Sequence, residues 1–431
     1  MALLRGLRRA IRTDMKKTYY ILFLLLSTAV LSWVLPWLYS LCFSERDREP
    51  FVSYSPINDC FIVTDFTNDS KAGEPDIFEV DPVTQNPGRH YTMDERDSLL
   101  PEIFVGQLSS KGQMPDSIKG IEVTMRDIRM NSWIFSSSPK DLNRSVPTVY
   151  PLMESMPARF KFEDPEVVLT MPGHVEIINI ESNSLDETKT GRFAKMFADK
   201  GFSFPAKEAN GNITTRKSYD NGYLIIDGDN KLYHLKMQAN RPSMARIPLN
   251  DTIVPRHVFV MENADRLLYG LFTDENDNLY AINHDETYSI AKLNGVKFNP
   301  EKDRIMIMKN LFSWCVKVKS GNESKWIALD PDDYSVLAVY DFSNPTSLSK
   351  ESRKWIFPFT ISFTDVDDKY VYPRVGDWSW KAVWLNIVLT LIVLFAARGR
   401  NIRCTIGKAA LTLVCGLFAF IPVMLMKRVA N

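Results

Sequence analysis

The sequence lacks an excess of charge of either sign, since its 52 basic and 52 acidic residues give a formal net charge of zero. Nucleic-acid-binding chains are usually basic, so this balance argues against a nucleic-acid partner. The G-x-S-x-G, H-E-x-x-H, Walker A and G-x-G-x-x-G patterns are also missing. No motif therefore nominates a catalytic residue or a cofactor, although carboxylates that meet only in the fold leave a hydrolase or lyase open.

Cysteine and histidine are scarce, with five residues of each type. The chain has no C-x-x-C pair and its histidines are scattered, so their spacing does not predict a zinc site. Only Cys60 and Cys315 lie in the long polar middle of the chain. A disulfide between them would suit an oxidising compartment, and two separate buried thiols fit the sequence equally well.

Long apolar runs are absent between residues 44 and 377, whereas one apolar zone lies near each end of the chain. The first zone, residues 19–43, carries no charge and exceeds the roughly 20 residues that a transmembrane helix needs. Residues 1–18 are basic, so the positive-inside bias places them in the cytoplasm and the middle of the chain outside. A cleaved signal peptide is the alternative, but the apolar sequence continues well beyond the small residues at 27–29.

The second apolar zone predicts two more transmembrane helices, over residues 380–397 and 409–426, joined by a basic connector over 398–408. Basic connectors stay in the cytoplasm, which independently places the middle of the chain outside. The final segment would then end outside, whereas Lys427 and Arg428 favour the cytoplasm. A re-entrant final segment therefore stays open.

The sequence predicts that the external part is mainly β. Four runs share one pattern, in which an apolar strand, an acidic turn and a second strand follow one another over residues 223–235, 268–282, 325–339 and 359–372. Asp, Asn and Gly tolerate the positive φ of hairpin turns, and alternating apolar residues flank them. The turns recur about every 35 to 55 residues, close to the repeat of four-stranded propeller blades. We expect a propeller-like domain, with a β-meander or sandwich as the alternative.

We divide the external part at a Pro-rich stretch. Residues 44–135 form an N-terminal β region, residues 136–165 a Pro-rich linker or loop, and residues 166–377 the propeller-like region. One helix is predicted after Ser184, as an N-cap with Glu187 three residues on, and Gly201 suits its C-terminal end. A second helix is predicted to begin near Thr92 and to be interrupted by Pro101.

Two sets of residues are weak candidates for binding. The acidic turns could offer oxygen ligands to calcium, but none has the full pattern of a calcium loop, which favours solvated hairpin turns. Four tryptophans would suit a sugar or a peptide if exposed, and core packing is the stronger interpretation for each. They are Trp133, Trp314, Trp326 and Trp355.

Three stretches carry a resemblance to a known family: residues 51–56 (FVSYSP), 199–207 (DKGFSFPAK) and 217–236 (KSYDNGYLIIDGDNKLYHLK). With the three-span layout, they resemble an uncharacterised domain-of-unknown-function family of inner-membrane proteins from Gram-negative gut anaerobes. The resemblance implies a bacterial inner-membrane location with a large periplasmic domain, and a setting beside ABC-transporter components. It transfers no functional residue, because none of these motifs has a known role.

We therefore expect a membrane-anchored periplasmic binding or interaction module, accessory to an inner-membrane transport system of the ABC type. Anchoring at both ends motivates this expectation, since a freely diffusing enzyme needs no pair of transmembrane helices after its external domain. A membrane-tethered ligand sensor that acts through a partner is the alternative. A periplasmic hydrolase or lyase is a further one. The small-molecule ligand stays unknown.

Overall fold

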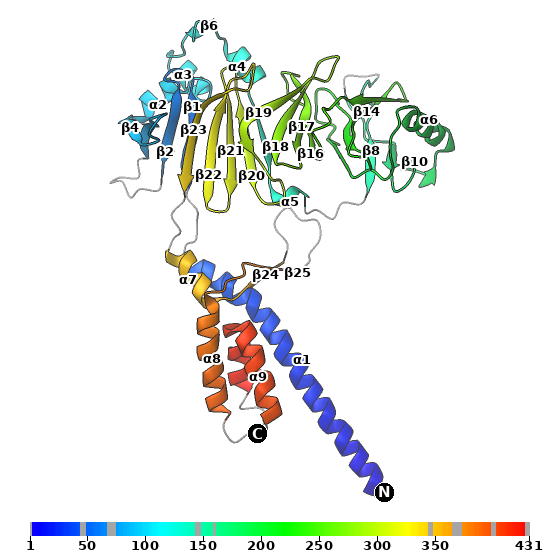
Figure 1. Cartoon of the computed structure of the whole chain (residues 1–431), viewed down its shortest axis with the longest axis vertical. Coiled ribbons are helices and arrows are strands. Elements are labelled where there is room, and N and C mark those ends of the chain that lie inside the picture. The colour runs from blue at the N-terminus through cyan, green and yellow to red at the C-terminus, as the bar shows by residue number, and fades with distance from the viewer. Residues whose placement is uncertain are drawn as a thin grey trace. The chain divides into compact units, whose positions relative to one another are not determined.

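The computed structural model describes residues 2–43, 49–66, 75–142, 148–157, 161–343, 348–363, 373–397 and 402–426 (Figure 1). The chain divides into two compact units. The helical unit combines Met1–Asp47 with Pro345–Asn431, and the β unit is Arg48–Asn344.

Five antiparallel sheets make up most of the β unit. Sheet 1 consists of β1 (Phe51–Ser55), β2 (Cys60–Asp65), β3 (Asp76–Val80) and β4 (Pro87–His90). Sheet 2 consists of β8 (Val149–Leu152), β9 (Val167–Thr170), β10 (Glu176–Asn179) and β11 (Ser184–Leu185). Sheet 3 consists of β12 (Glu208–Gly211), β13 (Tyr223–Ile226), β14 (Leu232–Gln238) and β15 (Arg241–Ile247). Sheet 4 consists of β16 (Pro255–Val260), β17 (Leu268–Asp274), β18 (Asn278–Asn283) and β19 (Ile290–Lys297). Sheet 5 consists of β20 (Arg304–Lys309), β21 (Trp314–Ser320), β22 (Glu323–Leu329), β23 (Val336–Ser343) and the earlier β7 (Trp133–Ser137).

Each of sheets 1 to 4 is a meander, in which every strand pairs with the next strand along the chain. This is the topology of a propeller blade, and it confirms the mainly β, propeller-like prediction at the level of the sheets. The hairpins predicted over residues 223–235, 268–282 and 325–339 are confirmed as β13–β14, β17–β18 and β22–β23. Acidic and Asn-containing turns form these hairpins because they supply residues with positive φ, such as Asn230 and Asp277.

Neighbouring sheets pack through apolar clusters in the order 1, 5, 4, 3, 2. In Figure 1, sheet 1 lies at one end of the β unit and sheet 2 at the other. Strand β13 shows how both faces of a sheet are used. Tyr223 and Ile225 belong to the cluster shared with sheet 2, whereas Leu224 and Ile226 belong to the cluster shared with sheet 4. The period of two along a strand, with both faces buried, explains the continuous apolar sequence there.

The stretch predicted as a Pro-rich linker or loop, residues 136–165, includes the end of β7, α5 (Pro139–Leu142) and β8 among irregular segments. Strand β7 reaches Ser137 and pairs with β20 of sheet 5, and β8 begins at Val149 and pairs with β9. Residues 44–135 and 166–377 are therefore not separate regions, because β7 joins a sheet made of much later strands. Prolines fit here because β8 is the last strand in its sheet order and an edge strand tolerates a missing backbone donor.

The helices of the β unit follow their capping residues. Helix α2 (Met93–Leu99) begins as predicted at Thr92, which forms a capping box with Glu95. Helix α6 (Glu187–Asp199) has Gly201 after its end, at φ +65°, as predicted. Its N-cap was wrongly predicted, because Asp186 rather than Ser184 accepts a hydrogen bond from the third helical N–H group, at 2.9 Å. Short elements complete the unit: α3 (Val105–Ser110), β5 (Ser117–Ile118), β6 (Ile121–Glu122), α4 (Met125–Asn131) and α5 (Pro139–Leu142).

The helical unit starts with α1 (Ala2–Cys42). Its apolar part, Thr18–Cys42, is the one helix among the described residues that is long and apolar enough to cross a membrane. This agrees with the first predicted span. By the same test of length and composition a signal sequence would also qualify.

The rest of the helical unit departs from the predicted pair of spans. It contains α7 (Leu348–Ile356), β24 (Thr360–Phe363), β25 (Pro373–Gly376), α8 (Ala382–Ala396), α9 (Ile402–Cys415) and α10 (Leu417–Leu425). Helix α8 has 15 residues, fewer than a span needs. The single helix predicted over 409–426 is wrong, because Gly416 interrupts it at φ +55°.

The fourth predicted hairpin is present as β24 and β25, although it belongs to the helical unit rather than to the sheet-rich region. Its acidic turn lies outside the described residues, as do residues 398–401 of the predicted basic connector. The rest of that connector, residues 402–408, is not a loop but the first half of α9.

Candidate functional site

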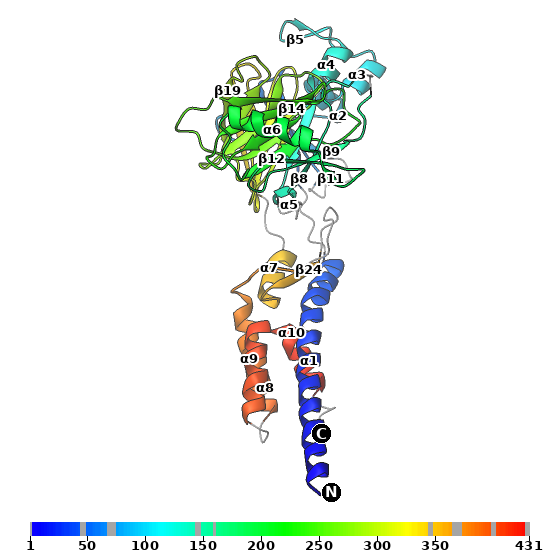
Figure 2. The same cartoon turned by 90° about the vertical axis from the view of Figure 1, so that its right-hand side faces the viewer.

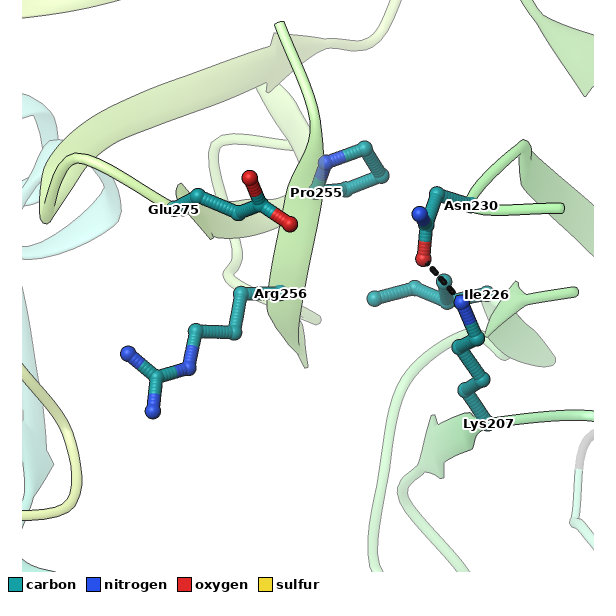
Figure 3. A pocket seen from close by; sticks show the side chains of 6 residues that line it. All are labelled: Lys207, Ile226, Asn230, Pro255, Arg256 and Glu275. Carbon is teal, nitrogen blue, oxygen red and sulfur yellow. Dashed lines mark hydrogen bonds between the residues drawn. The ribbon is translucent and has the colours of Figure 1, made fainter. Parts of the chain in front are cut away.

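A pocket of about 360 Å³ lies at the edge where sheets 3 and 4 meet (Figure 3). Its lining comes from both sheets: Lys207, Ile226, Asn230, Pro255, Arg256 and Glu275. The apolar floor is formed by two buried residues, the last of β13 and the first of β16. Figure 3 shows the three sheet 3 residues on one side of the pocket and the three sheet 4 residues on the other, with the Arg256 side chain pointing away from the sheet 3 residues.

Neighbouring groups hold the polar lining in place. The Lys207 ammonium donates a hydrogen bond to the Asn230 side-chain carbonyl, which lies in the β13–β14 turn. The backbone N–H of Glu275, in the β17–β18 turn, donates to the Val254 carbonyl at 3.1 Å. These contacts place an ammonium group on one wall and a carboxylate on the other. The pocket can therefore contact both anionic and cationic groups of a small ligand.

Charged groups behind the pocket fix the remaining cation. A guanidinium nitrogen of Arg256 lies 2.7 Å from a carboxylate oxygen of Glu301, and another lies 3.9 Å from Asp277. The next residue, His257, lies 2.9 Å from the Glu208 carboxylate through Nδ1. Because these pairs engage Arg256 and His257, the charged groups of the pocket that remain for a ligand are Lys207 and Glu275.

The acidic turns beside the pocket use their carboxylates internally. Asp227 accepts hydrogen bonds from the backbone N–H groups of Asp229 and Lys231, at 2.9 and 2.8 Å. Asp274 accepts from the N–H groups of Asn276 and Asn278, both at 2.9 Å. Burial opposes ionisation of Asp274, but the hydrogen bonds from Asn278, Tyr280 and Asn276 together outweigh it and lower its pKa. This use of the oxygens favours hairpin turns over calcium loops.

The four tryptophans do not form a binding surface. Trp314 and Trp326 are 1 % and 2 % exposed and belong to the clusters between sheets. Trp133 packs edge-on against Trp314, with ring centroids 5.0 Å apart, and donates its indole N–H to Asp265 at 2.8 Å. Trp355 is 47 % exposed and lies on α7 of the helical unit. Core packing is therefore the role of the first three.

Cys60 and Cys315 are free, buried thiols in the structure. They belong to different apolar clusters, the first under α2 and the second between sheets 1 and 5. Burial raises the pKa of each thiol to about 12. Both side chains thus behave as small apolar residues, and neither is an activated nucleophile.

A buried ionic cluster lies at the opposite ends of the strands that frame the pocket. Lys217, in the β12–β13 loop, contacts the carboxylates of Asp220 and, at 3.0 Å, Glu262. All three side chains are at most 4 % exposed. Glu262 also accepts from the backbone N–H of Asn221 at 2.7 Å. The cluster therefore ties the loop before β13 to the residues that follow β16.

A histidine extends this cluster into sheet 3. The Nε2 atom of His234 lies 2.6 Å from the carbonyl oxygen of Asn221, and Nδ1 lies 3.0 Å from the Tyr288 hydroxyl. Because a carbonyl only accepts, Nε2 carries the proton and Nδ1 accepts from the hydroxyl. Burial lowers the pKa of His234 to about 3, so the ring is neutral at physiological pH. The histidine is thus a structural connector.

The sequence contained a local signal for the cluster. Lys217, Asp220, Asn221 and His234 all lie within the third stretch that carries the family resemblance. Their partner Glu262 comes from a later sheet, so the sequence pattern alone did not show that they meet.

A family profile described as "Domain of unknown function (DUF4857)" matches residues 51–329. This match covers more than half of the chain. The chain belongs to the DUF4857 family. The predicted resemblance to an uncharacterised domain family is thereby confirmed, and the match covers sheets 1 to 4 and sheet 5 up to the end of β22.

Solved structures give only distant similarities. The chain is similar to the WD40 domain of SCAP from fission yeast (9 % identity, TM-score 0.23), with 74 % of this chain and 57 % of that chain covered. It is similar to apo AztD from Citrobacter koseri (12 % identity, TM-score 0.24, 78 % and 74 % covered). It is also similar to the β-propeller domain of Cps50 (Swd1) from Myceliophteria thermophila (6 % identity, TM-score 0.19, 69 % and 98 % covered). A search of curated proteins finds no match.

The DUF4857 match contains both features of the β unit described above. The pocket and the buried ionic cluster lie inside residues 51–329, at opposite ends of the strands of sheets 3 and 4. The apolar part of α1 and helices α8 to α10 lie outside it. The family profile therefore describes most of the β unit, and the apolar helices of the helical unit are additional.

Proposed function

We propose that this protein is a membrane-anchored periplasmic binding or interaction module, accessory to an inner-membrane transport system of the ABC type. The division of the chain carries the proposal. One unit contains an apolar helix long enough to span a bilayer, and the other contains a small-ligand pocket on a sheet scaffold. A rigid scaffold with such a pocket, held at a membrane, suits delivery or recognition better than a diffusing enzyme.

Two apolar helices, α1 and α8, contribute to the anchoring in this proposal. Helix α1 supplies one span, with the basic residues 1–18 on the cytoplasmic side. Helix α8 is about 22 Å long at 1.5 Å per residue, which is shorter than the roughly 30 Å hydrocarbon core. Three exposed tryptophans near its start favour the membrane interface and extend its reach. They are Trp378, Trp380 and Trp384.

The pocket supports binding through its composition. Its floor is apolar, and Lys207 and Glu275 offer opposite charges from opposite walls. Small-molecule sites typically combine an apolar surface with a few placed polar groups. We therefore expect a small ligand that carries charged groups.

Affinity purification from mild detergent, followed by mass spectrometry, tests the accessory role. The full-length protein carries the tag, and an unrelated tagged membrane protein is purified in parallel. We expect a transporter ATPase or permease to accompany this protein in stoichiometric amount and to be missing from the parallel preparation. Recovery of the protein alone, from membranes that contain it intact, would count against the proposal.

Thermal unfolding of the same full-length protein tests the pocket separately. Amphoteric probes such as dipeptides are expected to raise the unfolding midpoint, because ligands that bind the native state stabilise it. Lys207→Ala should remove that rise. Lys119→Ala, at an exposed lysine that pairs with Asp59 outside the pocket, should retain it. Equal responses of the two variants would show that the pocket is not the binding site.

A further inference from the structure

Helix α10 runs antiparallel to α1. Phe418, at the start of α10, shares an apolar cluster with Leu35 from the later part of α1. Val423, near the end of α10, shares another cluster with Leu24 from the earlier part of α1 and with Val393 from the end of α8. The end of α10 therefore lies beside the first half of the apolar part of α1, near Leu24.

Helix α9 runs in the opposite direction. The Lys408 ammonium, in its first half, lies 5.1 Å from the ring centre of Tyr20 at the beginning of the apolar part of α1. Cys415, its last residue, joins the cluster of Leu35 and Phe418. Helix α9 thus runs along α1 in the same direction as α1, and α10 runs back in the opposite direction, so α9 and α10 form a helical hairpin (Figure 2).

Gly416 makes the reversal. Its φ of +55° and ψ of −130° lie in a region that residues with a Cβ rarely adopt. Its N–H donates to the Thr412 carbonyl at 2.7 Å. A Cβ at this position would lie 2.1 Å from the Oδ1 atom of Asn386, which is a buried residue of α8. The turn therefore needs glycine for its backbone and for its close approach to α8.

Asn386 holds the turn from the neighbouring helix. Its side-chain Nδ2 donates to the Leu413 carbonyl at 3.1 Å, which is one of the carbonyls left without a partner where α9 ends. Irregular backbone at membrane depth is tolerated when it is buried within the protein and its polar groups are paired. Asn386 supplies this pairing at the hairpin turn.

The lengths agree with a hairpin rather than a span. Helix α10 has nine residues and is about 14 Å long, less than half of the roughly 30 Å hydrocarbon core. Leu24 lies six residues after Thr18, the start of the apolar part of α1, which is about 9 Å along a helix. The level that Val423 shares with Leu24 therefore lies about 9 Å from the start of the apolar part of α1.

We propose that α9 and α10 form a re-entrant hairpin in the lipid bilayer, with its turn at Gly416 and the end of α10 on the side where α1 begins. The proposal rests on the membrane anchoring described above. It places the basic residues 1–18, the basic connector after α8 and the charges after α10 on one side. This agrees with the positive-inside bias and removes the conflict at Lys427 and Arg428.

Reporter fusions to the full chain test the hairpin. Alkaline phosphatase, which is active only outside the cytoplasm, is inserted between β24 and β25 in one fusion and placed after Asn431 in another. Green fluorescent protein, which fluoresces in the cytoplasm, is placed after Asn431 in a third. We expect an active phosphatase at the first position only, and fluorescence from the third fusion.

Two outcomes would overturn the inference. An active phosphatase after Asn431, in a protein that resists carbonate extraction, would show that α10 completes a span and would leave the anchoring intact. Release of the protein from membranes by carbonate would contradict the anchoring itself, and the hairpin with it.

Gly416→Ala provides a second measurement in the same fusions. Gly407→Ala is its matched control, since a Cβ at Gly407 meets no atom within 4 Å. We expect phosphatase activity or fluorescence to differ from that of the unsubstituted fusions only for Gly416→Ala. Equal signals from both variants would contradict a turn at Gly416.

Discussion

Reversals of the chain are built differently in the two units. In sheet 3, the β13–β14 turn is closed by Asp227, which accepts hydrogen bonds from N–H groups two and four residues later. In the helical unit, the reversal between α9 and α10 depends on Asn386, which lies 27 residues before the carbonyl that it contacts. The β unit therefore repeats a local device, whereas the helical unit relies on a contact between helices.

Buried charge is also handled differently. The β unit contains ion pairs with almost no exposure, such as Lys217 with Glu262 and Lys309 with Asp265. The buried polar groups in α1, Thr28 and Ser32, are neutral hydroxyls that donate to carbonyls within their own helix. This contrast suits an aqueous setting for one unit and a bilayer for the other, because a charge in hydrocarbon is far more costly than a satisfied hydroxyl. The following variants test the contrast.

The largest effect is expected in the buried ionic cluster. Glu262→Ala leaves Lys217 with one fewer partner in a buried site, and breaking a buried pair typically destabilises by about 3–5 kcal/mol. Glu275→Ala, at an exposed carboxylate of the pocket, should change stability by less than about 0.5 kcal/mol. Denaturant unfolding of the detergent-solubilised protein measures both. Similar midpoints for the two variants would contradict the structural role of the cluster.

A pH effect of similar size is expected at Glu102, in the segment between α2 and α3. Burial raises its pKa to about 8, well above the ordinary value near 4.5. A raised native pKa means that folding favours the protonated form, so stability is full below about pH 4.5 and is lost as pH rises to about 8. The loss is on the order of 5 kcal/mol. Glu102→Gln should flatten stability across this window, and an unchanged pH profile would contradict the assignment.

A smaller effect is expected at the hairpin of the helical unit. Gly416→Ala forces a Cβ into a strained backbone region and toward Asn386, at a cost of roughly 3 kcal/mol. Gly407→Ala lies within α9 in open space and should stabilise slightly, by about 0.5–1 kcal/mol. Hydrogen exchange should increase in peptides of α9 and α10 for the first variant and stay unchanged in sheets 3 and 4. Faster hydrogen exchange in sheets 3 and 4 instead would contradict the role of Gly416 in the α9–α10 turn.

The smallest effect distinguishes two neighbouring residues before α6. Asp186→Ala removes the side chain that caps the helix and should destabilise by about 1 kcal/mol. Ser184→Ala changes an exposed residue of β11 and should be neutral within about 0.5 kcal/mol. Unfolding midpoints of the two variants decide the matter. A larger loss of stability for Ser184→Ala would support the predicted capping box of Ser184 and Glu187 instead.

The helix starts show where sequence reasoning succeeds. The capping box of Thr92 and Glu95 was predictable, because its two partners are three residues apart. The N-cap of α6 was not, because Ser184 and Asp186 are both good caps by residue type. The pairing of β10 with β11 decides between them by placing Ser184 in a strand.

The pocket and the ionic cluster show where sequence reasoning stops. Lys207 and Glu275 lie 68 residues apart and face each other only because sheets 3 and 4 pack together. Lys217 and Glu262 meet for the same reason. The stretch that carries the family resemblance contains Lys217 but not Glu262, and nothing in the sequence showed that the residues of either pair meet.

By itself, the sequence determined the features whose causes are local: the apolar length of α1, the strand and turn pattern of the hairpins, and the glycine after α6. The tertiary structure alone decided the pairing of β7 with β20, the order of the sheets, and the break at Gly416. The physical reason is the range of the interactions. Turns, caps and apolar runs involve residues a few positions apart, whereas sheet packing and the contact of Asn386 with the α9–α10 turn join distant segments whose meeting depends on the whole fold.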